Sequence, residues 1–165
     1  MSNRFDIDIE EVSEVKPVLP AGPHDCKLHS IKVIEGESDN GFWYRMDLKV
    51  ILTGEEEIKL LGIPEPQLVL GQFLAFNEEG KFQVKLCPIF GQFLRVTGFN
   101  TRQADFEEGT EDATSDAEYI TQMVRNMNQE IMGMDAIVFT NIGKDSRDET
   151  TRIHRAVKLA KAEVA

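Results

Sequence analysis

The sequence predicts one mainly β domain, a five-stranded barrel with a helical insertion between the third and fourth strands. Three observations indicate this architecture. Three stretches of strand character follow one another between residues 24 and 61, with short turns between them. Two helical stretches occupy the middle of the chain, and two more strands close it. Because no helix connects the first three strands, the order fits an all-β barrel better than a β-α-β sheet.

Charge and proline content set the expected boundaries. Residues 1–19 read as an acidic N-terminal arm that ends among closely spaced prolines. Residues 20–160 then form a single domain, with an acidic loop inserted at 100–116, and residues 161–165 form a short tail. With 165 residues and 41% hydrophobic content, the chain is long and apolar enough for a globular core.

The first strand is expected at residues 24–34, where His24 and Cys26 share the face that lines the core. A phase slip near Ser30 brings the later apolar residues inward, as a β-bulge does. Residues 35–41 form a turn that closes on Asn-Gly, a hairpin signal. The next strand therefore pairs with the first.

The second strand, within residues 41–52, alternates strictly and so has two different faces. The inward set is Tyr44, Met46, Leu48 and Val50. The outward set is Trp43, Arg45, Asp47 and Lys49. Trp43, the single tryptophan of the chain, has two possible roles. It either covers a second layer of the fold or stacks a nucleic-acid base beside cations that hold phosphates.

A short third strand is expected at residues 58–61, where Ile58 and Leu60 alternate with their neighbours. Residues 62–80 are harder to assign, because two prolines forbid regular pairing at their start. The apolar stretch from Leu68 to Phe76 fits either a strand or a helix. The sequence alone does not decide between a strand and a helix in this part of the predicted barrel.

Helix signals then appear in two places. The first helix begins near Pro88 and ends at Gly98, a residue suited to a helix C-terminus. The second helix is expected over about 116–132, because Ser115 and Glu118 form a capping box ahead of an apolar stripe. Both helices carry the apolar periodicity of a core-facing surface.

Residues 134–142 and 150–159 predict the fourth and fifth strands, and residues 143–149 the hairpin loop between them. Three strands, a helical insertion and a two-stranded hairpin is the order of the oligonucleotide/oligosaccharide-binding (OB) barrel.

The net charge of −11 argues against a protein that coats nucleic acid by bulk charge. The acids, however, concentrate in residues 1–16 and 105–118, whereas residues 81–104 contain bases and no acid. Acidic loops ordinarily serve solvation. The sequence lacks an apolar stretch long enough to span a bilayer and a secretory signal, and Cys26 and Cys87 read as buried thiols, so a cytoplasmic location is expected.

Catalytic and metal sites are not predicted. His24, Cys26 and His29 are possible ligands, but a strand points His29 away from the other two and a fourth ligand is not close in sequence. The sequence lacks phosphate-binding loop motifs and a nucleophile motif. We therefore expect a non-enzymatic protein without a cofactor.

The pattern of residue types resembles the phage-encoded single-stranded-DNA-binding proteins of the OB-fold type, over roughly residues 20–159. The matching segments are Gly22-x-His24-x-Cys26-x-Leu28, Gly41-x-x-Tyr44-x-Met46-x-Leu48-x-Val50, Phe93-Leu94-Arg95-Val96-Thr97-Gly98 and Met132-Gly133-x-x-Ala136-x-Val138. His24 stands where the family usually has an aromatic residue. The basic C-terminus also departs from the acidic tail with which many single-strand binders recruit replication partners.

The resemblance implies a protein that coats single-stranded DNA, with RNA as the alternative, during replication or recombination and without sequence preference. It places the binding surface on the outer side of the first three strands, with a basic hairpin that clamps the backbone. The implied binding residues are Lys27, His29, Trp43, Arg45, Lys49, Lys59, Lys144, Arg147, Arg152 and His154. For any single cation, the other interpretation is a solvated barrel face.

Two further roles stay open. Replication or recombination proteins could be recruited by the acidic loop 105–118 or by the N-terminal arm. The alternative function is an acidic phage interaction protein, or a virion-associated protein, whose surface binds a protein partner.

Overall fold

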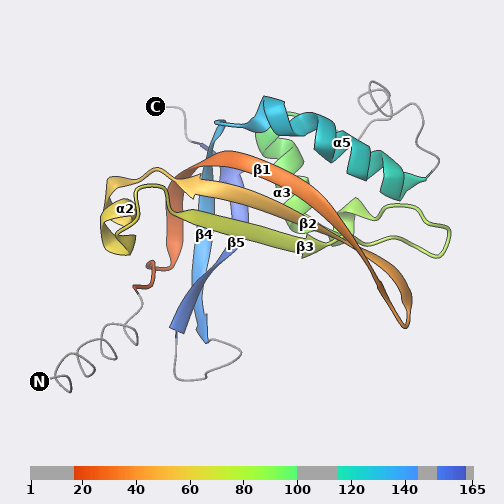
Figure 1. Ribbon diagram of the computed structural model, residues 1–165, viewed down its shortest axis with the longest axis horizontal. Coiled ribbons are helices and arrows are strands. Elements are labelled where there is room, and N and C mark those ends of the chain that lie inside the picture. Colours follow the sequence, from red (N-terminus) through yellow and green to blue (C-terminus); the bar gives the residue numbers. More distant parts are fainter. Residues whose placement is uncertain (1–16, 100–114, 145–151, 163–165) are drawn as a thin grey trace, which may run out of the picture.

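The computed structural model describes residues 17–99, 115–144 and 152–162. Within these residues the chain forms five antiparallel strands in one sheet, in the order β3-β2-β1-β4-β5 (Figure 1). The strands are β1 (Gly22–Ser38), β2 (Gly41–Leu52), β3 (Gln67–Phe73), β4 (Asp135–Lys144) and β5 (Arg152–Lys161). The helices are α2 (Glu55–Leu61), the short 3-10 helix η1 (Val84–Leu86), α3 (Pro88–Thr97) and α5 (Asp116–Ile131). The predicted mainly β, OB-like class is confirmed.

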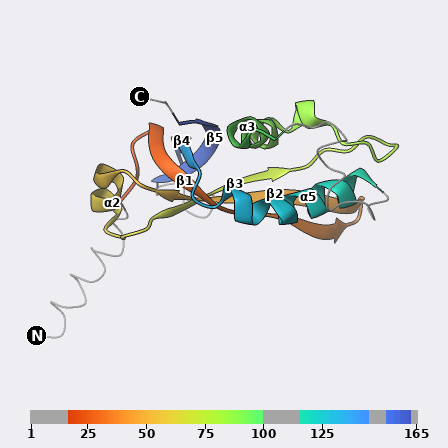
Figure 2. The same ribbon diagram turned by 90° about the horizontal axis from the view of Figure 1, so that it is seen from above.

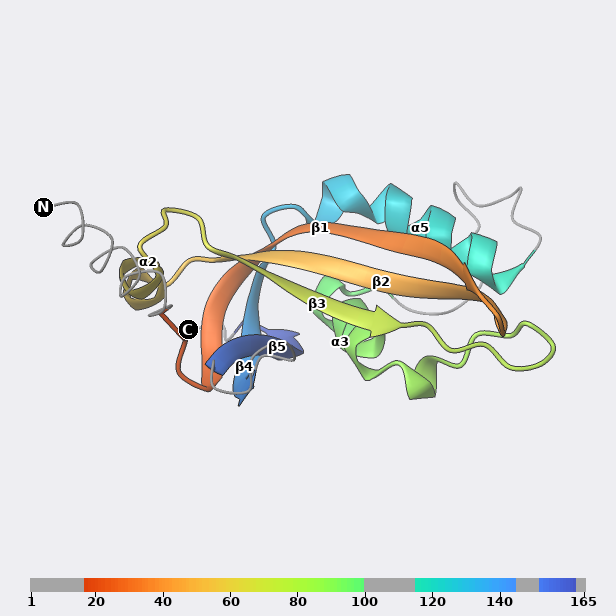
Figure 3. The ribbon, with the colours of Figure 1, turned by 60° about the horizontal axis from the view of Figure 1, so that its bottom comes forward.

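Strand β1 belongs to both halves of the sheet. Its first residues, 22–27, pair with β4, and the strand then follows β2 as far as Ser38. The pairing register with β2 shifts between Leu28 and Ser30, which leaves His29 as the extra residue of a bulge. The phase slip expected near Ser30 is therefore confirmed, and Figure 3 shows how β1 bends between the two halves.

The third strand predicted at residues 58–61 is wrong, because these residues belong to α2. Ile58 and Leu61, three residues apart, are both half-buried, whereas Leu60 is 45% exposed. This is the burial pattern of a helix, because a strand would bury Ile58 and Leu60 together. Three glutamates in the first turn favour the positive end of the helix dipole, and Gly62 ends the helix with φ 69°. The third strand is β3, in the segment that the sequence left open between strand and helix.

Both predicted core-facing helices are confirmed. α3 begins at Pro88, and Gly98 caps its C-terminal end. The φ of Gly98 is 81°, a backbone angle that glycine adopts without the strain it causes in other residues. α5 begins after Ser115, whose hydroxyl accepts a hydrogen bond from the Glu118 amide at 3.2 Å. Figure 3 shows α5 beside β1 and α3 beside β3, at opposite edges of the β1–β2–β3 part of the sheet.

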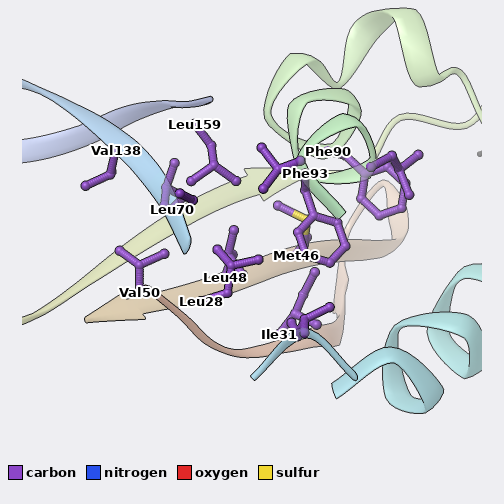
Figure 4. Close-up of a cluster of buried hydrophobic side chains, with 14 of the residues drawn as sticks. Leu28, Ile31, Met46, Leu48, Val50, Leu70, Phe90, Phe93, Val138 and Leu159 are labelled. Atoms are coloured by element: carbon purple, nitrogen blue, oxygen red, sulfur yellow. The ribbon is translucent and has the colours of Figure 1, made fainter. Parts of the chain in front are cut away.

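The core lies between the inner faces of the strands and the apolar faces of α3 and α5. The predicted inward residues of β2 are buried, apart from Tyr44, which is half-buried. Figure 4 shows buried side chains from all five strands and α3 converging on this interior. They include Leu28, Ile31, Met46, Leu48, Val50, Leu70, Phe90, Phe93, Val138 and Leu159.

The sheet does not close into a hydrogen-bonded barrel, because among the described residues β3 and β5 share no ladder. Instead α3 lies next to both strands (Figure 2). The Gln72 side-chain oxygen of β3 accepts a hydrogen bond from the Phe90 amide at 3.0 Å. The Gln92 oxygen of α3 accepts one from the Leu159 amide of β5 at 2.8 Å. Two glutamines thus join the helix to the strands on either side of the gap.

Candidate nucleic-acid interface

The side of β1, β2 and β3 that points away from the core carries several of the predicted binding residues. We call it the outer face. Its members, in register across the strands, are Lys27, Ser30, Lys32, Ile34 and Gly36, then Trp43, Arg45, Asp47, Lys49 and Ile51, then Gln67, Val69, Gly71 and Phe73. The structure thus brings Lys27, Trp43, Arg45 and Lys49 onto one surface, as the sequence predicted.

Aromatic residues occupy the end of the outer face near the β1–β2 hairpin. Trp43 is half-buried, and its ring meets the Phe73 ring edge-on, with the centroids 5.6 Å apart. Phe73 itself is 60% exposed, whereas Phe42, the residue before Trp43, points to the opposite side of β2. The exposed Phe73 ring beside a partly accessible indole forms a surface on which planar bases can stack.

Trp43 also has a packing role, because it lies directly over Gly36 of the neighbouring strand. A Cβ atom added at Gly36 would be 2.0 Å from Cζ2 of the indole, closer than atoms can approach. Glycine at this position therefore lets the ring lie flat against the sheet. The two interpretations of Trp43 are compatible, since the ring covers the backbone and still has solvent access.

The cations of the outer face are not equally available. Arg45 donates from Nε and Nη2 to the two carboxylate oxygens of Asp47, at 2.9 and 2.8 Å. The hydrogen bonds and charge of Asp47 raise the pKa of Arg45. The pair lies across Gly71, where an added Cβ would be 3.1 Å from Asp47 Oδ1. Lys49 and Lys32 are the cations beside this pair, Lys32 directly opposite Asp47.

At the other end of the outer face, Lys27 and His29 line a cavity of about 400 Å³. Lys27 is exposed, and His29 is the half-buried bulge residue. Lys59 lies elsewhere, on the exposed side of α2. The sequence grouped these three cations together, but the structure separates Lys59 from the sheet surface.

The predicted basic hairpin is formed by the ends of β4 and β5. Lys144 and Arg152 are exposed and directly paired, whereas Arg147 lies outside the described residues. His154 is half-buried, and its Nδ1 accepts a hydrogen bond from the Leu19 amide at 3.2 Å. Burial and the nearby His24 lower the pKa of His154. His154 therefore anchors the segment before β1.

His24 occupies the core position that the sequence predicted, with 6% exposure. Its Nδ1 lies 2.9 Å from Glu57 Oε1, and its Nε2 lies 2.8 Å from the Pro20 carbonyl oxygen, both within hydrogen-bonding distance. Thr140 Oγ1 donates to the same carbonyl at 3.0 Å. The hydrogen bond from His24 lowers the pKa of Glu57. The cluster fixes α2 and the segment before β1 to the sheet.

The two cysteines are free and buried, in agreement with the prediction. Burial raises the pKa of Cys26 to about 12, with smaller contributions from Asp25 and Asp135, and burial also raises the pKa of Cys87. Neither thiol has the depressed pKa of a nucleophile. In the described parts of the chain, histidine, cysteine and acidic side chains do not gather in threes that could hold a metal ion.

Sequence reasoning missed one aromatic residue and one cation of this surface, Phe73 and Lys32. Phe73 was not identified because its strand was not assigned, although Leu68 and Leu70 alternate with it. Lys32 was missed because the bulge at His29 reverses the face to which the following residues point. The slip identified near Ser30, if carried forward, places Lys32 on the outer face.

The acidic segments lie mostly outside the described residues, which exclude 1–16 and 100–114. Their expected roles in partner recruitment stay predictions. Among the described helices, none is long and apolar enough to cross a membrane. Comparison of the chain with known protein families and with curated protein sequences finds no match.

Proposed function

We propose that the protein binds single-stranded DNA on the outer face and, as a phage-type OB protein of the cytoplasm, coats exposed strands during replication or recombination. The observation that supports this proposal best is the contact of Trp43 with the exposed Phe73, on the same face as the cations Arg45 and Lys49. Stacked bases contribute ~1–3 kcal/mol each, and cations follow the phosphates without reading sequence.

The acidity of the whole chain does not conflict with this proposal. The electrostatic potential close to the surface decides where a DNA strand binds, because charges more than about 10 Å away are largely screened at moderate salt. The outer face carries four cations and one acid, which are Lys27, Lys32, Arg45 and Lys49 and the acid Asp47. Binding is therefore expected to be local to this surface and sensitive to salt.

Trp43 gives a direct test, because it is the single tryptophan of the chain. Titration with oligothymidylate at low salt is expected to quench tryptophan fluorescence. Phe73→Ala should weaken binding about tenfold, as expected for one lost stacking contact. Leu86→Ala is the matched control, since Leu86 is 67% exposed and lies in η1, outside this surface. Unquenched fluorescence, or equal affinity for both variants, overturns the proposal.

The cations are tested by salt dependence. Each lysine that contacts a phosphate should contribute about 0.7 to the slope of log affinity against log salt concentration. Lys32→Gln combined with Lys49→Gln should lower that slope, whereas Lys81→Gln combined with Lys85→Gln should leave it unchanged. All four lysines lie in described parts of the chain, but the second pair lies between β3 and α3.

A further inference from the structure

The cavity of about 400 Å³ beside the β1 bulge lies at the end of the outer face opposite Trp43. Its lining includes Lys27, His29, Ile51, Ile58, Glu65 and Met132. We infer that it is a base-binding subsite, which takes one nucleobase of a strand bound on the outer face. This inference rests on the proposed function and adds a second contact point to it.

The cavity is continuous with the outer face. Ile51 is a cavity residue and also belongs to the outward row of β2 that contains Lys49 and Trp43. Ile51 is paired directly with Lys27 of β1, which also lines the cavity. At about 3.4 Å per residue, Trp43 and Ile51 are about 27 Å apart along the strand. Single strands toward the upper end of the ~4–16 nucleotides that one OB fold binds can reach both ends, whereas a strand of about four nucleotides occupies only one of them.

Backbone hydrogen bonds hold two walls of the cavity in place. On one side, the turn between α5 and β4 is fixed to the bulge: the Leu28 amide donates to the Met134 carbonyl, and the Gly133 amide donates to the Leu28 carbonyl, both at 2.8 Å. On the other side, the connection between α2 and β3 is fixed by the Leu52 amide, which donates to the Pro66 carbonyl at 2.8 Å. A preformed site loses less entropy on binding than one that must be ordered.

The lining matches the chemistry of a nucleobase. Ile51, Ile58 and Met132 supply apolar surface for the flat faces of a ring, and Met132 is 61% exposed. Glu65 can accept a hydrogen bond from a base N–H group, while Lys27 can reach the attached phosphate. A free anion would meet the carboxylate of Glu65, and a hydrocarbon chain would leave these polar groups without partners.

Thr53 offers a way to fill the cavity without disturbing its walls. Its side chain is exposed and belongs to the lining, while its amide donates to the Asp25 carbonyl at 3.0 Å irrespective of the side chain. Thr53→Phe should weaken the binding of an oligothymidylate of about twelve nucleotides about tenfold, yet leave one of about four nucleotides unchanged. Leu86→Phe, which adds a phenyl ring at an exposed position outside the cavity, is the matched control and should bind both as the wild type does.

A second measurement keeps the test decisive if Thr53→Phe fails to fold. Benzoylphenylalanine is introduced at position 132, and in a separate protein at position 86, where the native side chain has a similar exposure. Irradiation should crosslink the longer oligonucleotide at 132 and not at 86. Equal crosslinking, or unchanged affinity in a folded Thr53→Phe protein, overturns the subsite while Trp43 quenching still supports the outer face. If the oligonucleotide does not quench Trp43 fluorescence in the wild-type protein, the proposed function itself is overturned.

Discussion

Asn128 of α5 hydrogen-bonds both backbone groups of Ile31 in β1. Its Oδ1 accepts from the Ile31 amide at 2.8 Å, and its Nδ2 donates to the Ile31 carbonyl at 2.7 Å. Ile31 lies beyond the part of β1 that pairs with β4. At Ile31, the Asn128 side chain thus makes the two hydrogen bonds that a neighbouring strand would make. It thereby satisfies backbone groups of a strand edge with which another chain could otherwise pair.

Replacement of Asn128 by alanine should therefore destabilise the fold. The variant leaves the amide and the carbonyl of the buried Ile31 without their partner, at a cost of about 1–3 kcal/mol. Urea unfolding followed by circular dichroism measures the loss. Gln129→Ala, at the next and exposed helix position, should cost less than about 0.5 kcal/mol. Equal midpoints for the two variants would contradict the assignment.

Glu57 should stabilise the fold through His24. Glu57→Ala removes the partner of Nδ1 on a histidine that is 6% exposed, so a loss of about 1–3 kcal/mol is expected. The neighbouring Glu56 is exposed on the same helix, and Glu56→Ala should change stability by less than about 0.5 kcal/mol. Chemical denaturation of both proteins provides the comparison, and a neutral Glu57→Ala would show that the contact contributes nothing.

Stability should fall as the pH drops below 6.5, the ordinary pKa of histidine. The pKa of His154 is lowered in the folded chain, so below 6.5 the unfolded chain binds more protons and is favoured. The lowered pKa of Glu57 adds a loss of the same sign below 4.5. His154→Gln keeps an acceptor for the Leu19 amide and removes the titration. Thermal melts across this range should show a shallower decline in that variant, and an identical pH profile would refute the role of His154.

Gly36→Ala should displace the indole of Trp43. The added methyl group would occupy space that the ring already fills, and overpacking of this kind costs about 1–3 kcal/mol. Gly143→Ala is the control, because an added Cβ there meets no atom within 4 Å. Tryptophan emission should move to longer wavelength in Gly36→Ala alone. Unchanged emission would show that the ring does not lie over Gly36.

Asp47→Asn should tighten oligonucleotide binding at low salt, provided that the outer face binds DNA. The substitution frees the guanidinium of Arg45 from its carboxylate partner and removes the acid at the centre of this surface. The salt slope should grow by about 0.7, the value for one additional phosphate contact. Glu79→Gln, an exposed acid in the turn after β3, should leave affinity and slope unchanged. Weaker binding by Asp47→Asn would assign Asp47 a positive role in binding.

Alternation and helix caps were sufficient to predict most of the fold. β2, the bulge in β1, and both ends of α3 follow from local patterns, because each residue type there agrees with its burial. The third strand was misplaced because four residues, 58–61, satisfy a strand pattern and a helix pattern equally. Gly62 and the preceding glutamates were the signals that favour a helix.

The site was predicted less completely than the fold. Trp43, Arg45 and Lys49 lie on the expected face, because a period of two places them there in any regular strand. The pairing of Arg45 with Asp47 and the hydrogen bond to His154 depend on side-chain geometry, which the sequence does not encode locally. The cavity required segments distant in sequence, from α2 and from the turn after α5, and no local pattern indicates their meeting.

The missing ladder between β3 and β5 has a consequence for how this fold can change. Its two glutamine contacts come from identical tetrapeptides, Gly-Gln-Phe-Leu at 71–74 and at 91–94, one in a strand and one in a helix. A closure held by side chains can be loosened or tightened one residue at a time, whereas a backbone ladder changes only when a whole strand shifts. Substitution of Gln72 or Gln92 therefore changes how α3 is held against β3 or β5 while the pairing of the strands stays as it is.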